Sequence, residues 1–159
     1  MLYLFEPGTY IFEGSYFLAD SMKPFSIEGR FTASGGFEES SIEGTCEKRD
    51  GGSKFPLKIE MTSSGLKGFL GARVVAHLGP LKLDGWIAGI AEGHSGVARD
   101  ASGNCASIQV LRLKPKAHTA QGLLIWGADK AVSFALTIGP FDPEMALENV
   151  VSIRDGQRA

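Results

Sequence analysis

The chain has 159 residues, of which 43% are hydrophobic and 21% charged, and its formal net charge is −2. These values fit one globular domain, residues 1–159, large enough to fold without a metal or a disulfide. No run of basic residues exceeds the pair Lys48-Arg49, which argues against nucleic acid as a partner.

The N-terminal sequence and the length of the apolar runs indicate where in the cell we expect the protein. The stretch up to Glu6 contains no basic residue, unlike a secretory signal. No apolar run approaches the roughly 18 residues that a membrane helix requires. We therefore expect a cytoplasmic protein with no membrane partner. We expect Cys46 and Cys105 to be reduced thiols, although a disulfide between them stays open.

Nine short runs alternate between apolar and polar residues, the pattern of strands with one buried face. In the second run, Phe25, Ile27 and Phe31 share one face and polar residues share the other. Glycine, serine, aspartate or proline separates most of the runs. The predicted strands are 9–18, 25–33, 37–47, 55–62, 69–78, 81–90, 107–114, 122–126 and 131–138.

The short connections predict an antiparallel meander, because parallel pairing needs long crossovers. An open sheet of nine strands would leave exposed edges, so we predict closure into a small all-β barrel. One C-terminal helix is predicted at 143–154, with Asp142 as N-cap and Pro143 at its first position. This architecture is similar in outline to calycin-like proteins, and the resemblance implies a barrel that holds a small apolar ligand.

The tetrapeptide Ser-Ile-Glu-Gly occurs at 26–29 and again at 41–44, with looser versions at 12–14 and 83–85. We interpret its glycines as positions where the barrel bends or a bulky side chain crosses the sheet. The alternative is a cation-binding ring formed by Glu13, Glu28, Glu43 and Asp84. The register disfavours this ring, because Glu43 shares a face with Phe37.

Several residues are candidates to line a ligand cavity, although aromatic side chains also fill ordinary cores. Arg73 and His77 lie on one face of a predicted strand and can bind an anionic headgroup, since arginine pairs with carboxylates. The alternative places both in solvent. The candidate ligand-binding residues are Tyr10, Phe12, Tyr16, Arg73, His77, Trp86 and Trp126.

The stretch 91–106 is predicted to be a long loop, which serves as a solvated connection, a lid or a catalytic segment. Its candidate catalytic residues are His94, Asp100 and Cys105. His118, in a basic turn, is expected to be exposed. The sequence has neither metal-ligand spacing nor a glycine-rich phosphate loop, so we predict no metal and no cofactor.

The leading hypothesis is a barrel that binds a small, mostly apolar and possibly anionic ligand. Its aromatic strands would form the walls, Arg73 and His77 the anchor, and 91–106 the lid. One alternative is a self-assembling module, a homo-oligomer built on the small-residue face of 131–138. Another is a cofactor-independent isomerase, cyclase or hydrolase that uses His94 or His77 as acid–base and Cys105 as nucleophile.

Overall fold

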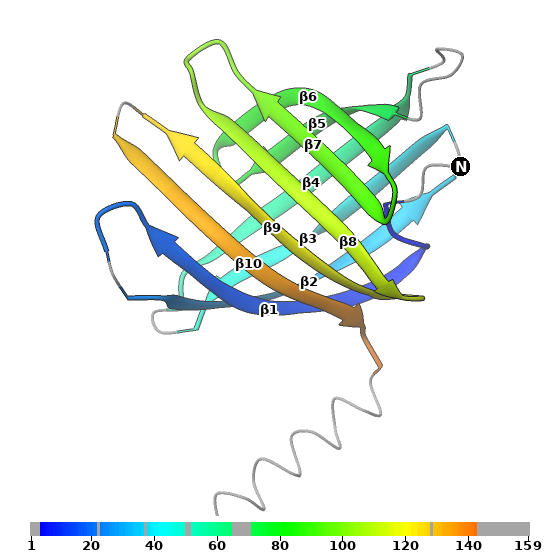
Figure 1. Cartoon of the computed structure of the whole chain (residues 1–159), viewed down its shortest axis with the longest axis horizontal. Coiled ribbons are helices and arrows are strands. Elements are labelled where there is room, and N and C mark those ends of the chain that lie inside the picture. Colours follow the sequence, from blue (N-terminus) through cyan, green and yellow to red (C-terminus); the bar gives the residue numbers. More distant parts are fainter. Residues whose placement is uncertain are drawn as a thin grey trace, which may run out of the picture.

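The computed structural model describes residues 4–21, 23–36, 38–49, 52–64, 71–127 and 129–142. They form a closed antiparallel barrel in which each strand pairs with its sequence neighbours and β1 pairs with β10 (Figure 1). The predicted fold class is confirmed. The strands are β1 (Gly8–Leu18), β2 (Phe25–Gly35), β3 (Glu39–Lys48), β4 (Lys54–Ser63), β5 (Gly71–Leu78), β6 (Leu81–Ile90), β7 (Gly93–Arg99), β8 (Cys105–Lys114), β9 (Ala117–Trp126) and β10 (Lys130–Pro140).

The barrel has ten strands, so the prediction of nine is wrong by one. The additional strand is β7, which falls within the stretch predicted to be a loop and pairs with both β6 and β8. Its sequence is rich in glycine and small residues, which have low strand propensity. Pairing on both sides overrides that propensity. The predicted C-terminal helix lies outside the described residues.

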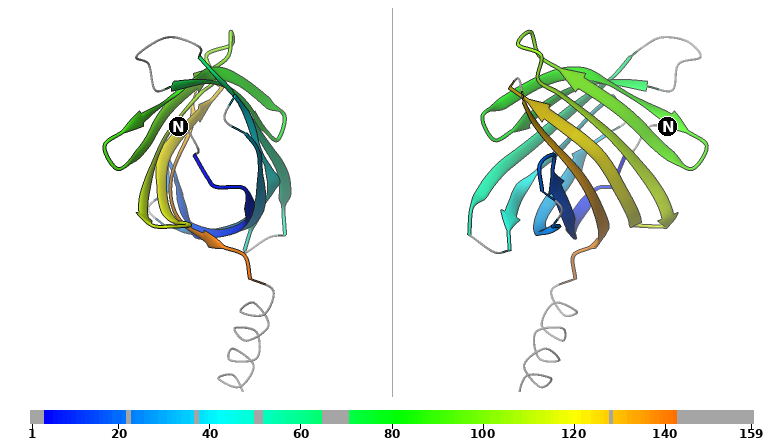
Figure 2. Two further views of the ribbon diagram at one scale, coloured as in Figure 1. Left: turned by 90° about the vertical axis from the view of Figure 1, so that its right-hand side faces the viewer. Right: turned by 60° about the vertical axis from the view of Figure 1, so that its left-hand side comes forward.

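The two ends of the barrel differ. At the end that we call the N-terminal end, β1 begins and β10 finishes; we call the opposite end the mouth. Leu4 and Phe5 are buried, with 7% and 9% exposure, and the short segment from residue 4 to the start of β1 runs inside the ring of strands (Figure 2). The N-terminal end is therefore filled by the chain itself. Among the described residues, no helix has the length and apolar character needed to span a membrane.

The repeated tetrapeptide marks places where strands approach closely. A Cβ on Gly44 would collide with the Arg30 carbonyl oxygen, and one on Gly85 would collide with that of Val97. These glycines are therefore positions of close approach between strands, as one part of the interpretation predicted. Glu13 pairs with Glu28 across the sheet, but Glu43 pairs with Thr32 in another row. The described residues contain no group of three or more His, Cys, Asp or Glu that could hold a metal ion.

Candidate functional site

The barrel interior is apolar along its length, but its two halves differ in exposure. Inward-facing side chains near the N-terminal end are buried, among them Tyr10, Phe31, Val110 and Ile138. Nearer the mouth, Cys46, Leu83 and Ala98 are also buried. Other inward-facing apolar side chains there are partly exposed, although they pack against the same core: Ile27, Leu57, Ile59, Leu78, Ala106, Ile108 and Leu124. The mouth half therefore presents an apolar wall that is partly open to solvent.

Two polar groups, the Tyr16 hydroxyl and the Lys48 ammonium, lie near the mouth. The Tyr16 hydroxyl is buried and has no hydrogen-bond partner among the described residues. The rings of Tyr16 and Phe25 stack with centroids 5.2 Å apart, and the Lys48 ammonium lies 5.6 Å from each centroid. A buried polar atom without a partner is rare in proteins, because leaving it unpaired costs free energy. The Tyr16 hydroxyl thus lacks, among the described residues, the hydrogen-bond partner that a buried polar atom ordinarily has.

A second polar cluster lies at the N-terminal end. The Tyr10 hydroxyl donates a hydrogen bond to the Glu6 backbone oxygen at 2.8 Å. The Glu6 carboxylate lies 3.6 Å from the Arg112 guanidinium. His118 is 7% exposed, its ring stands edge-on to Phe5 at 4.8 Å, and its Nδ1 has no partner among the described residues. Arg112 and His118 face each other across β8 and β9.

The two histidines of this end are less basic than usual. Burial lowers the pKa of His94. Burial also lowers the pKa of His118, the charges of Arg112 and His94 lower it further, and Glu6 opposes them. Both shifts favour the neutral imidazole, whose two nitrogens are one donor and one acceptor. These groups can therefore hydrogen-bond a ligand near neutral pH.

The predicted ligand-binding residues separate into two groups. Tyr10, Phe12 and Tyr16 are buried inside, and Trp126 shares the inward face of Leu124 at the mouth. By contrast, Arg73, His77 and Trp86 lie on the outer face, because Ala72, Val74 and Ala76 take the inward positions of β5. They cannot anchor a ligand inside the barrel, so that part of the prediction is wrong.

The candidate catalytic residues do not converge. Asp100 closes the turn after β7, accepting hydrogen bonds from the Ser102 and Asn104 amides at 2.9 Å and the Asn104 side chain at 2.7 Å. Cys105 begins β8 beside that turn. His94 lies near the opposite end of β7, five residues or about 16 Å along the strand from Arg99, the partner of Cys105. The predicted lid is also wrong as a continuous loop, because residues 93–99 form strand β7 and residues 105 and 106 begin β8.

Sequence reasoning missed the N-terminal cluster. His118 was expected in solvent, but β9 begins at Ala117 and places it on the inward face with Ala120 and Leu124. The signal was present as alternation through 118–124, weakened by small residues. Leu4 and Phe5 belong to the apolar run before β1, which nothing in the pattern assigns to the barrel interior.

Comparison with known proteins gives a match of fold. No family model and no curated protein matches the chain. The solved structure of the S-type phycobiliprotein lyase CPES from Guillardia theta is similar, with a TM-score of 0.60 and 9% sequence identity. The match covers 86% of this chain and 88% of that one. At this identity the likeness supports the calycin-like barrel fold.

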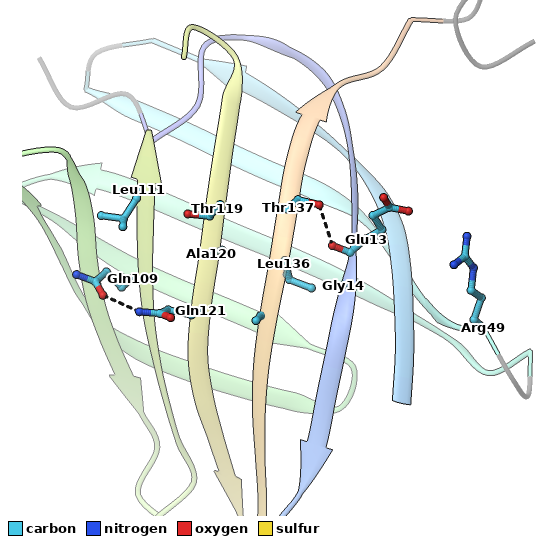
Figure 3. Close-up of a pocket in the computed structure, with 11 residues that line it drawn as sticks. Glu13, Gly14, Arg49, Gln109, Leu111, Thr119, Ala120, Gln121, Leu136 and Thr137 are labelled. Atoms are coloured by element: carbon cyan, nitrogen blue, oxygen red, sulfur yellow. Dashed lines mark hydrogen bonds between the residues drawn. The ribbon is translucent and has the colours of Figure 1, made fainter. Parts of the chain in front are cut away.

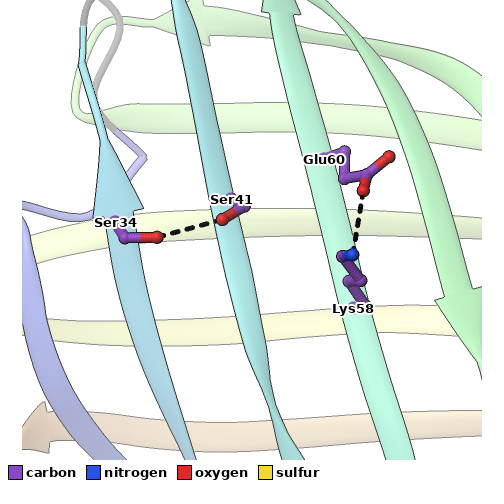
Figure 4. A network of polar contacts seen from close by, with 4 residues as sticks. All are labelled: Ser34, Ser41, Lys58 and Glu60. Atoms are coloured by element: carbon purple, nitrogen blue, oxygen red, sulfur yellow. Dashed lines mark hydrogen bonds and ion pairs between the residues drawn. The ribbon is translucent and has the colours of Figure 1, made fainter.

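The outer surface of the barrel contains a candidate site for contact with another protein molecule. Over β2–β4 it is polar and charged: Lys58 pairs with Glu60 at 3.1 Å, and the Ser34 and Ser41 hydroxyls lie 3.0 Å apart (Figure 4). The segments 105–111, 119–125 and 131–139 of β8–β10 contain no charged residue. A groove of about 510 Å³ runs from this face to Glu13 and Arg49 at its border, with the bonded pair Gln109 and Gln121 along it (Figure 3). We call this surface the uncharged face.

Proposed function

We propose that the protein binds a small, mostly apolar ligand in the barrel interior, which the ligand enters through the mouth. The observation that carries the proposal is the partly exposed apolar wall with the buried, unpaired Tyr16 hydroxyl on it. Small-molecule sites are typically apolar and carry a few polar groups that fix orientation. The wall supplies the apolar surface and Tyr16 the polar group.

The aromatic side chains at the mouth support the same ligand class. Phe25 and Trp126 flank the mouth, and aromatic side chains provide large apolar contact areas at low entropic cost. The similar barrel is that of a phycobiliprotein lyase.

Two variants of neighbouring residues on β8 test the proposal. Ala106 faces inward against Leu124, whereas Ser107 faces outward. We expect Ala106→Phe to weaken binding of the fluorescent probe 8-anilinonaphthalene-1-sulfonate at least tenfold, because the ring enters the wall. Ser107→Phe should leave the affinity near that of the wild type. Equal affinities in two variants that both melt like the wild type would contradict interior binding.

A second candidate function, self-assembly, is favoured by the uncharged face. In a two-fold dimer the same patch of both copies meets, and a patch without charged side chains can be buried there without the cost of desolvating charges. We expect Gln121→Glu to shift the molar mass measured by light scattering toward the monomer. The control Thr45→Glu changes the charged side of the barrel. A wild type that stays monomeric at high concentration would exclude this candidate.

A further inference from the structure

The first described residues have the chemistry of an apolar acid. Leu4 and Phe5 place apolar side chains inside the barrel, with 7% and 9% exposure. Phe5 packs against Tyr10 and Phe31 at ring-centroid distances of 5.3 and 5.0 Å. Glu6 follows at once and places its carboxylate 3.6 Å from Arg112. Residues 4–6 thus combine two buried apolar side chains with a carboxylate that pairs with the guanidinium of Arg112.

The groups around this carboxylate suit an anion. Arg112 offers a planar fork of donors that fits carboxylates. His118, its cross-strand partner, has a nitrogen that is buried and unpaired among the described residues. His94 lies on β7, which pairs with β8, and acts electrostatically on His118. Glu6 satisfies Arg112 but leaves the His118 nitrogen without a partner.

The pair between Glu6 and Arg112 is poorly held. Their side chains are 50% and 54% exposed, and exposed ion pairs contribute little to stability because water screens them. Exchanging the Glu6 carboxylate for another one therefore costs little. The apolar contacts of Leu4 and Phe5 are the larger cost, which an apolar ligand body can replace.

We propose that Arg112 and His118 form a binding site for the carboxylate of an apolar monocarboxylic acid, and that residues 4–6 occupy it as a displaceable internal substitute. The inference rests on the proposed interior binding and adds the ligand class and a competing segment. Arg112 pairs with the ligand carboxylate, and His118 donates a hydrogen bond from its Nδ1. The acid reaches the N-terminal end only when residues 4–6 leave.

Calorimetric titration with decanoic acid and 1-decanol tests this site, because the two probes differ in their headgroup. We expect Arg112→Gln to weaken decanoic acid binding about tenfold and to leave decanol unchanged. Glu6→Gln should tighten decanoic acid several-fold, because it removes the competing carboxylate. Lys114→Gln is the matched control on the same strand, since it also removes one positive charge near that end.

The outcomes separate this inference from the proposed function. Equal binding of acid and alcohol in the wild type and all variants would overturn the carboxylate site while leaving interior binding intact. A second outcome would also overturn the carboxylate site. If Lys48→Gln no longer binds decanoic acid more tightly than decanol while Arg112→Gln still does, the ligand headgroup lies at the mouth. If neither probe binds, and Ala106→Phe leaves probe affinity unchanged, interior binding itself is refuted and the carboxylate site with it.

Discussion

The ring of Phe12 lies over the backbone of Gly29, its partner across β1 and β2. A Cβ on Gly29 would overlap the Cζ of this ring and the carbonyl oxygen of Thr45. The glycine of the repeated tetrapeptide therefore gives an aromatic side chain room inside a narrow barrel. The pairing links a local sequence feature to the curvature of the whole sheet.

Gly29→Ala should lower the free energy of unfolding by about 1–3 kcal/mol, the usual cost of overpacking a core. Gly139→Ala is the matched control, because a Cβ there meets nothing within 4 Å and the residue also lies in a strand. We expect the control to stay within about 0.5 kcal/mol of the wild type. Urea unfolding measures both. Equal stability of the two variants would show that the close approach is unimportant.

Stability should fall as the pH drops below about 6.5. The pKa values of His94 and His118 in the folded protein lie below the ordinary 6.5, so the unfolded chain binds protons that the folded one does not. The free energy of unfolding then decreases with falling pH, from 6.5 down to the folded pKa values, and levels off below them.

The pH effect is measured as the melting temperature at pH 7.5 and 5.5 for the wild type and a His94→Gln/His118→Gln variant. The charged groups that act on His118 are Arg112, His94 and Glu6. We expect the decrease in melting temperature to be smaller in the variant, which keeps Arg112 and Glu6. A variant that loses as much as the wild type would show that these histidines do not carry the dependence.

The two thiols should differ in reactivity. Cys46 is 4% exposed, and burial raises the pKa of its thiol to about 12, so little thiolate forms. Cys105 is partly exposed at the start of β8. We expect iodoacetamide at pH 8 to label Cys105 in the folded protein and Cys46 only after unfolding, as read from peptide masses. Native labelling of Cys46 in a Cys105→Ser variant would contradict its burial.

The sequence predicted the barrel because strand periodicity and short turns are local signals. Alternation through Phe25, Ile27 and Phe31 was strong, and nine of ten strands were found from it. β7 was missed because Gly93 and Gly96 have no strand propensity of their own. Neighbouring strands impose its conformation, and a single sequence does not record that pairing.

The candidate site was predicted less completely. Tyr10, Phe12 and Tyr16 were grouped because they share one face of the predicted strand 9–18, and Trp126 was chosen as an aromatic residue that can line a cavity. Arg73 and His77 were chosen for their chemistry, although their neighbours on β5 fill the interior. Arg112 and His118 are brought together locally by the β8–β9 hairpin, but Glu6 lies more than one hundred residues away in the chain. Only the closed barrel brings Glu6 to this pair, so no local pattern could indicate the whole group.

Fluorescence of single-tryptophan proteins tests the central claim, interior binding, most directly. Trp86→Phe leaves Trp126 on the inward face at the mouth, and Trp126→Phe leaves Trp86 on the outer face, where it is 46% exposed. The measurement is acrylamide quenching with and without 1-decanol. The account predicts that decanol protects Trp126 and leaves quenching of Trp86 unchanged. Protection of Trp86 alone, or of neither tryptophan when decanol is bound, would contradict a ligand site inside the barrel.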